Sequence, residues 1–490
     1  MLCITNKASG AALSQTPQAS AEQVLNRAIT ASGGAEALNA IRSVRLKITS
    51  DEWPQQQSAS VKPPFRPTRA AQTLLLDLAG NRTRVDMSSE GGGFESRTTL
   101  VVQNGRGVSY NQRAMTSQAI PRIPPERLAS NARLLPNLLL RQVLAASSSL
   151  RYVGPAKFEG RPHDVISFAS PDSQKIALYF DGRSGLLSKF ETTSGSPELG
   201  SQASEVIFSD YVTVGAHRVP KTSLRREGGI LVARSRLSAE FDPSDIDTDF
   251  TVDDARYTQP KRVPQDFSPR VERLADGVIV LHNIAGVNYN TMAVAFKDYV
   301  VAVEAPGTSD GSDKVIARIK QEFPGKPIRY VVVTHHHGDH VSGIRSYIAE
   351  GATVIATRAN REVIEALAAE QRKDRLDSLP RKPEYLFADG AKRVITDGEQ
   401  TLELLQVGPH PHANEMLIAH VPTARALFQA DMFFAPTTEG PPSPRFSGEL
   451  AFAKRLGELG LKLDHVASVH GRTVSYAEFV RAFGGGDSTG

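Results

Sequence analysis

The chain has 490 residues, of which 40% are hydrophobic and 22% are charged, a composition typical of a globular protein with two or three domains. Its net charge of +4 is nearly neutral for this length and does not favour nucleic acid as a partner. Cys3 is the single cysteine, so a disulfide framework is excluded and any metal site in the folded part must use nitrogen and oxygen ligands. No apolar run reaches the ~18 residues of a transmembrane segment.

Residues 1–21 are expected to form a disordered or targeting tail. Lys7 and a short apolar run at 8–13 precede the sequence ASA at 19–21, which is typical of a signal-peptide cleavage site. The apolar run is shorter than the ~7–15 residues usual in signal peptides. We expect an exported, periplasmic protein, and a cytoplasmic location is the alternative.

Residues 22–240 are predicted to form an antiparallel, β-rich domain. Apolar residues at helical spacing predict two short helices over 22–44. Short strands separated by turn signals then follow from about residue 45, as in a meandering antiparallel sheet. One helix, at 125–146, carries an apolar stripe suited to cover that sheet. A loop rich in proline and glutamine runs from Trp53 to Thr68.

The sequence IALYFD at 176–181 and the segment 210–220 resemble the lipoprotein-carrier-like domains of bacterial envelopes. The resemblance implies a half-open barrel with an apolar concavity, and it supports export. No catalytic constellation is present in this domain, where His163 and His217 stand alone and are interpreted as structural. Residues 241–270, rich in aspartate and proline, are predicted to be a linker.

Residues 271–490 alternate between strand and helix patterns, which predicts a layered α/β domain. A buried strand at 330–334 runs directly into the sequence HHHGDH. Burying so many unpaired polar groups is unfavourable, whereas neutral imidazole and ionised carboxylate are ligands that zinc prefers. Further histidine and aspartate residues follow or precede other strands of this domain, where the loops of an open α/β sheet converge. Seven residues are therefore candidate ligands of two metal ions: His335, His337, Asp339, His340, His412, Asp431 and His470.

Other histidines compete for these roles. His336 lies between two candidates and should point away from them. His410 is an alternative to His412, which lies nearer the following strand. His282, His420 and His465 are interpreted as packing or supporting residues.

The sequence THHHGDH matches the H-x-H-x-D-H signature of the metallo-β-lactamase superfamily, and QAD at 429–431 and VHG at 469–471 match its later motifs. The chain is therefore similar to that superfamily, which implies an αββα sandwich. The resemblance implies two zinc sites bridged by one aspartate. Their ligands are then His335, His337 and His412 for one ion, Asp339, His340 and His470 for the other, and Asp431 between them.

The resemblance implies a dinuclear zinc hydrolase, in which metal-bound hydroxide attacks an ester, thioester, lactone or related bond of a small molecule. Asp339 is the expected catalytic residue, which both binds metal and orients the nucleophile. β-Lactamases of the superfamily carry Cys or Ser where this chain has Asp431, so the chain resembles the lactonase and general hydrolase branches and is not expected to be a true β-lactamase.

Two alternatives remain open at this point. Iron on the same ligands would give a sulfur dioxygenase-like oxidoreductase, because His and Asp suit iron as well as zinc. An envelope protein that binds lipid or lipoprotein through the N-terminal domain, with a secondary metal domain, is the other alternative.

Overall fold

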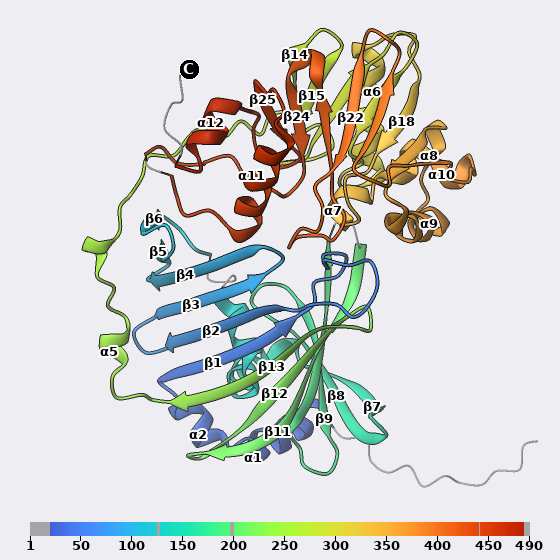
Figure 1. Cartoon of the computed structure of the whole chain (residues 1–490). Helices are drawn as coiled ribbons and strands as arrows, with labels where there is room; N and C mark the ends of the chain where they lie inside the picture. Colours follow the sequence, from blue (N-terminus) through green and yellow to red (C-terminus); the bar gives the residue numbers. More distant parts are fainter. Residues whose placement is uncertain (1–19, 125–127, 197–199, 441, 485–490) are drawn as a thin grey trace, which may run out of the picture. The chain divides into compact units, whose positions relative to one another are not determined.

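The computed structural model describes residues 20–124, 128–196, 200–440 and 442–484 (Figure 1). The predicted targeting tail therefore lies almost wholly outside the described residues. The chain divides into two compact units, each discontinuous in sequence. The first comprises Met1–Ile41, Pro125–Thr193 and Glu205–Lys221, and the second comprises Arg42–Pro124, Ser194–Ser204 and Thr222–Gly490. The domain boundaries at 22–240, 241–270 and 271–490 stay a prediction.

The N-terminal half contains a thirteen-stranded antiparallel sheet, in the order β6-β5-β4-β3-β2-β1-β13-β12-β11-β10-β9-β8-β7. Almost every strand pairs with its neighbour in sequence, as the frequent turn signals predict, and the β1–β13 pairing joins the two ends of the meander. The predicted antiparallel β-rich architecture is confirmed. The strands are β1 (Ser43–Glu52), β2 (Thr68–Asp77), β3 (Arg82–Gly91), β4 (Phe94–Gln103), β5 (Arg106–Asn111), β6 (Thr116–Ile120), β7 (Arg151–Phe158), β8 (Arg161–Ala169), β9 (Lys175–Asp181), β10 (Leu187–Ser196), β11 (Gly200–Val214), β12 (His217–Glu227) and β13 (Ile230–Phe241).

Helices of the first unit follow their sequence signals. α1 (Ala21–Ala31) begins with a capping box between Ser20 and Gln23, and α2 (Ala35–Ala40) follows it. The helix predicted at 125–146 is shorter: a 3₁₀ turn at Ser130–Leu134 precedes α4 (Pro136–Ala145), because proline is favoured at the first position of a helix. Residues 125–127 of that prediction lie outside the described residues.

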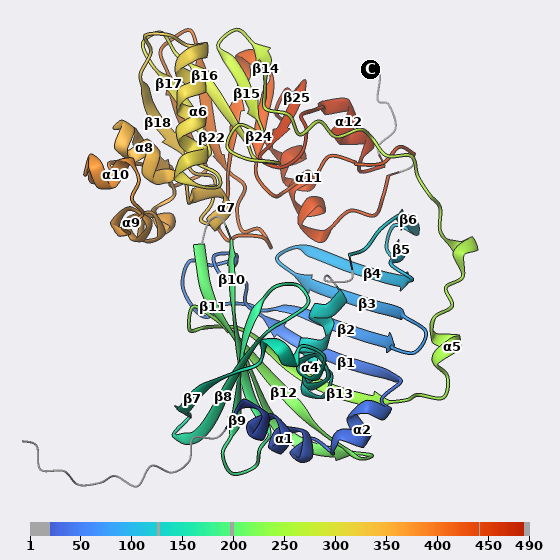
Figure 2. The ribbon, with the colours of Figure 1, turned by 180° about the vertical axis from the view of Figure 1, so that it is seen from behind.

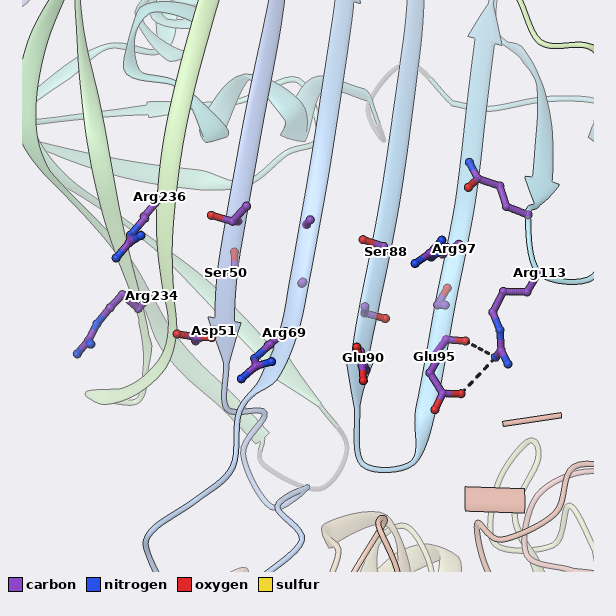
Figure 3. Close-up of a pocket in the computed structure, with 16 residues that line it drawn as sticks. Ser50, Asp51, Arg69, Ser88, Glu90, Glu95, Arg97, Arg113, Arg234 and Arg236 are labelled. Carbon is purple, nitrogen blue, oxygen red and sulfur yellow. Dashed lines mark hydrogen bonds and ion pairs between the residues drawn. The ribbon is translucent and has the colours of Figure 1, made fainter. Parts of the chain in front are cut away.

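One face of the sheet in the second unit is polar, and Figure 3 shows the arginine-lined hollow of about 860 Å³ on it. Opposite charges face each other across neighbouring strands: Arg234 pairs with Asp51, Asp51 with Arg69, and Arg69 with Glu90. Opposite charges in this arrangement stabilise a solvated sheet surface. This face is therefore an exterior surface and does not contribute to a core.

The C-terminal part contains two further sheets. The seven-stranded sheet has the order β14-β15-β16-β17-β18-β19-β20, and the six-stranded sheet has the order β21-β22-β23-β24-β25-β26. The strands are β14 (Arg270–Ala275), β15 (Val278–His282), β16 (Asn290–Ala295), β17 (Val300–Val303), β18 (Ile328–Val332), β19 (Thr353–Ala356), β20 (Tyr385–Phe387), β21 (Lys392–Thr396), β22 (Thr401–Gln406), β23 (Leu417–Val421), β24 (Ala426–Gln429), β25 (His465–Ser468) and β26 (Val474–Ser475).

These sheets form the central layers of a four-layer sandwich. Val280 and Met292 of one sheet share a buried apolar cluster with Leu404 and Phe428 of the other. Helices α6 (Ser309–Glu322), α8 (Ile344–Glu350) and α9 (Arg361–Ala369) cover the outer face of the seven-stranded sheet (Figure 2), and α11 (Ser447–Leu459) and α12 (Tyr476–Arg481) cover the six-stranded sheet. The αββα arrangement expected from the sequence is confirmed.

Two local features differ from the expected pattern. The sequence pattern predicts a helix over 342–350 with Asp339 and His340 just before it, but these two residues lie inside the one-turn helix α7 (Gly338–Val341), which Ser342 and Gly343 separate from α8. The predicted linker contains only short helical turns, α5 (Ile246–Asp249) and a 3₁₀ turn at Asp254–Arg256, before β14 begins. Among the described residues, no helix combines the length and apolar character that crossing a bilayer requires.

Candidate metal centre

All seven candidate ligands converge on one place in the second unit. Each of two groups offers ligand atoms that lie within 4.8 Å of one another, and Asp431 belongs to both. The pairing matches the two sites that the superfamily resemblance implies, while the metal-binding role of each residue stays a prediction. The first group is His335, His337, His412 and Asp431, and the second is Asp339, His340, Asp431 and His470.

In the first group, side chains from both sheets meet. His335 and His337 follow β18 of the seven-stranded sheet, whereas Asp431 follows β24 of the six-stranded sheet. The Nε2 atom of His412 lies 3.2 Å from Nε2 of His335 and 3.1 Å from Oδ2 of Asp431. Three polar atoms from distant parts of the chain therefore point at one small volume.

The second group surrounds α7. Nε2 of His340 lies 2.9 Å from Oδ2 of Asp431, and Nε2 of His470 lies 3.3 Å from Oδ2 of Asp339. The side chains of Asp339 and His470 are 21% and 15% exposed, so this group is the more accessible of the two.

The donor set is consistent with metal ions. Four ligands at 2.0–2.1 Å from a tetrahedral zinc lie about 3.3 Å from one another, close to the distances found here. Nδ1 of His337 and Oδ1 of Asp431 are buried without any hydrogen-bond partner, which is unfavourable unless another group satisfies them. The set of nitrogen and oxygen donors suits zinc and iron alike, and it does not identify the metal.

The charge states of His335, His337 and Asp431 suit this role, whereas His340 carries a proton that it must release to bind a metal ion. Burial, and then the neighbouring histidines, lower the pKa of His335 and His337 well below the usual value, so both rings are neutral and keep a lone pair. Burial opposes ionisation of Asp431, but the facing His340 ring holds the pKa of that carboxyl well below its usual range. Burial would also lower the pKa of His340, yet Asp431 and Asp339 raise it well above its usual value.

Buried amides hold the loops that carry two of these residues. Gln429 accepts a hydrogen bond from the backbone N–H of Met432 at 3.0 Å and donates to the carbonyl of Phe433 at 2.9 Å, which closes the turn around Asp431. Asn290 donates to the carbonyl of Gly471 at 2.6 Å, beside His470. These supporting roles were not predicted, although Gln429 belongs to the QAD motif.

Glu304 is a further residue that the sequence analysis missed. It is fully buried and follows β17, and its carboxylate accepts a hydrogen bond from the backbone N–H of Thr334 at 3.2 Å. Its second oxygen lies 3.5 Å from Nδ1 of His340. Neither of these two atoms makes a hydrogen bond, so the contact is an ion pair, and a carboxylate in such a position helps to orient the candidate ligand His340. The signal in the sequence was a charged residue directly after a fully apolar strand.

Residues far from the motif in sequence also reach the centre. The side-chain amide of Gln57 donates to Oδ1 of Asp339 at 2.7 Å, and the carbonyl of Ser58 accepts from Nε2 of His337 at 2.9 Å. The ring of Phe94 meets His412 edge-on, with 5.4 Å between ring centroids. Nothing in the local sequence of the loop from Trp53 to Thr68 indicated such contacts.

The competing histidines lie outside both groups. His336 donates to the carbonyl of Ser58 at 2.9 Å, and burial lowers its pKa to about 4. Both ring nitrogens of His410 are used, because Nε2 donates to a carbonyl oxygen and Nδ1 accepts from the backbone N–H of His412. His282 and His420 are paired with Glu272 and Glu403.

Comparison with known proteins locates the family resemblance. A family described as the metallo-beta-lactamase superfamily matches residues 306–477. The 2,4-dinitroanisole O-demethylase subunit alpha of Nocardioides sp. (strain JS1661) is 24% identical over 232 residues, which is 47% of this chain and 64% of that protein. This chain therefore covers less than two thirds of that curated relative.

Similar solved structures include a metallo-beta-lactamase from Pontibacter korlensis, with 16% identity and a TM-score of 0.34 over 44% of this chain and 98% of that chain. The metallo-beta-lactamase FIM-1 from Pseudomonas aeruginosa, in its mono-zinc form, gives 16% identity and a TM-score of 0.33 over 45% of this chain and 96% of that chain. From the family match, residues 306–477 of this chain are a metallo-β-lactamase superfamily domain.

Proposed function

We propose that the chain is a dinuclear zinc hydrolase that cleaves an ester, thioester, lactone or related bond of a small molecule. The observation that carries the proposal is the pair of His/Asp groups that share Asp431 within a metallo-β-lactamase superfamily domain. Zinc ions in these sites would act as Lewis acids and lower the pKa of a bound water from about 15.7 towards ~7. His335, His337 and His412 with Asp431 would hold one ion, and Asp339, His340 and His470 with Asp431 the other.

The chain's own residues then determine how substrate and water are arranged. Oδ1 of Asp339 accepts from Gln57, and Oδ2 faces the rings of His340 and His470, so the carboxylate is fixed in one orientation. Burial opposes ionisation of Asp339, but the facing rings of His340 and His470 lower the pKa of its carboxyl far below the usual range and hold it ionised. We assign Asp339 the role of hydrogen-bond acceptor for the attacking water.

The test starts with metal analysis of the purified protein, which separates zinc from iron. His337→Ala and Asp431→Ala should lose bound metal and hydrolysis together, whereas His465→Ala, which lies outside both groups, should keep them. The substrate panel should contain lactones, thioesters, aryl esters and β-lactams, with β-lactams expected to be poor. Hydrolysis that persists after the metal is removed would refute the proposal.

The curated relative supplies a second candidate reaction. It is named as a subunit of an O-demethylase that acts on 2,4-dinitroanisole, an aryl methyl ether. Including that ether in the panel tests whether this chain cleaves ethers instead of esters. Iron together with oxygen uptake would support an oxidoreductase in place of either hydrolase.

A further inference from the structure

We infer that the loop of residues 53–67, between β1 and β2, is part of the active site. This 53–67 loop positions His337 and Asp339, and it forms one wall of a hollow that takes an uncharged aryl or alkyl group of the substrate. The role of the hollow in binding substrate rests on the proposed hydrolase function. The positioning of His337 and Asp339 by the loop depends only on contacts within this chain.

The first step is the orientation of His337. A carbonyl oxygen can only accept, so Nε2 of His337 must carry the proton that it donates to Ser58 at 2.9 Å. Nδ1 then keeps its lone pair, and it is the buried nitrogen of this ring without a partner. The Ser58 carbonyl therefore selects the tautomer in which Nδ1 can bind a metal.

Second, backbone hydrogen bonds fix the 53–67 loop against two other segments of the chain. The carbonyl of Gln56 accepts from the backbone N–H of Gly338 at 3.1 Å, and the carbonyl of Ala59 accepts from the N–H of Asn414 at 2.7 Å. A Cβ atom at Gly338 would lie 2.1 Å from Oε1 of Gln56 and 3.2 Å from its Cβ, so a larger residue there would force the Gln56 side chain to move. The loop is thus tied to two of the three segments that carry residues of the first group, next to His337 and near His412.

The third step is the hollow beside these contacts, which has a volume of about 450 Å³. Gln57 and Ser58 line it, and so does Pro411, the neighbour of His412. Its apolar walls are Trp53, Phe65, Ile230 and Leu231, and among the described residues that line it Arg66 alone is charged. An apolar hollow next to a reaction centre binds uncharged aryl or alkyl groups, because burying such groups releases water.

The larger hollow shown in Figure 3 is a poorer candidate for the substrate. It measures about 860 Å³ and is lined by arginines and carboxylates of the polar sheet face. None of its described lining residues is hydrogen-bonded to a residue of either metal group. The smaller hollow is connected to the centre, because the side chain of Gln57 and the carbonyl of Ser58 line it or adjoin it and are bonded to Asp339 and His337.

The positioning role is tested by metal affinity, measured on metal-depleted protein by titration with Co²⁺. Gln57→Ala should weaken Co²⁺ binding about 10–100-fold, as expected for loss of a group that orients a ligand, and it should change the visible spectrum of the cobalt form. Gln55→Ala is the matched control, because Gln55 is on the same loop but donates to the carbonyl of Glu227. Equal Co²⁺ affinities and spectra for the two variants would overturn the positioning role.

The hollow is tested by ligand binding, which needs no catalysis. Trp53 is the single tryptophan of the chain, so energy transfer from it to the neutral probe N-phenyl-1-naphthylamine reports binding at this place. Ile230→Asp, at a side chain 58% exposed, should weaken probe binding at least tenfold and raise KM for an aryl ester while the metal content stays unchanged. Val153→Asp, at an exposed valine elsewhere in the chain, is the control.

The outcomes separate this inference from the proposed function. Absence of energy transfer in the unaltered protein, or equal probe binding by the Ile230→Asp variant, would show that the hollow does not bind an uncharged aryl or alkyl group. If Ile230→Asp loses probe binding and the unaltered protein hydrolyses no ester, the hollow is a binding site but the proposed hydrolase function is wrong. A higher KM of the Ile230→Asp variant for an aryl ester, with unchanged metal content, supports both the binding role of the hollow and the hydrolase function.

Discussion

At the scale of single residues, Asp431 is a candidate ligand held in an uncommon backbone conformation. Its backbone has φ +57°, in the left-handed region that aspartate tolerates better than most residues. The turn is kept by the side-chain amide of Gln429, which is fully buried and bonded to three groups around it. The conformation of Asp431 therefore depends on the hydrogen bonds of Gln429.

Gln429→Ala is predicted to lower the free energy of unfolding by about 2–3 kcal/mol. The substitution leaves the buried N–H of Met432 without its side-chain partner, and it leaves the carbonyl of Phe433 and the hydroxyl of Ser468 with only the 3.5 Å bond between them. Poorly paired buried groups are costly. Urea unfolding measures the loss, and metal analysis should show reduced occupancy. Gln265→Ala, which removes one local bond to the carbonyl of Val263, should change stability by less than about 0.5 kcal/mol. Similar values for both variants would contradict the prediction.

The seven candidate ligands could be found from the sequence because they lie in short motifs next to strands. Their supporting residues could not, because Gln57 reaches Asp339 across 282 positions and no local pattern marks that contact. Glu304 is intermediate: its position after an apolar strand was visible, but its partner His340 was not. Short sequence motifs thus identify the candidate ligands. Gln57 and Glu304, which orient these ligands, belong to no motif, so the sequence alone does not reveal their role.

At the scale of elements, the strands of the C-terminal domain were predictable because both faces are buried. β15, β17 and β23 are buried along their whole length, and such strands appear in the sequence as short apolar runs. The one-turn helix α7 was missed because four residues give no periodicity. The position of β13 beside β1 was equally hidden, because partners such as Val44 and Phe241 are distant in sequence.

Helices α8 and α9 are joined to α10 (Arg375–Ser378) by a single buried arginine. Arg345 of α8 is fully buried and donates to the carbonyls of Leu367 and Ala368 at the end of α9, and to the carboxylate of Asp374. Burial would raise the pKa of Asp374, but its hydrogen bond and ion pair with Arg345 lower it to about 2. The ionised pair therefore stabilises the fold.

Asp374→Asn is predicted to lower the free energy of unfolding by about 2–3 kcal/mol at neutral pH. This is the free energy that corresponds to the shift of the Asp374 pKa from 3.8 to about 2. Because the folded pKa is depressed, the stabilisation is complete above pH 4 and is lost as the pH falls through about 2. The difference in unfolding free energy between the parent and Asp374→Asn should thus shrink between pH 4 and pH 2. Arg361→Ala, at an exposed pair with Glu365, is the control and should leave the free energy of unfolding nearly unchanged at any pH. A difference for Asp374→Asn that does not vary with pH would contradict this account.

At the scale of the whole domain, the candidate metal centre combines residues from the two sheets of the sandwich. His335 and His337 extend from the seven-stranded sheet, and His412, Asp431 and His470 lie at strands of the six-stranded sheet. Ligands contributed by both sheets come together only in the folded state. Any ion bound there should therefore stabilise the folded state against the unfolded chain.

Removal of metal is accordingly predicted to lower the Tm of the domain. Binding that stabilises only the folded state contributes about 4 kcal/mol when the free metal is a thousandfold above its Kd, and a chelator removes this contribution. Differential scanning calorimetry with and without chelator measures the loss, which re-addition of Zn²⁺ should reverse. Asp431→Ala removes the shared ligand, so its Tm should respond little to the chelator. An unaltered protein whose Tm is the same with and without chelator would show that the two groups do not hold metal, since a centre spanning both sheets cannot be emptied without loosening their connection.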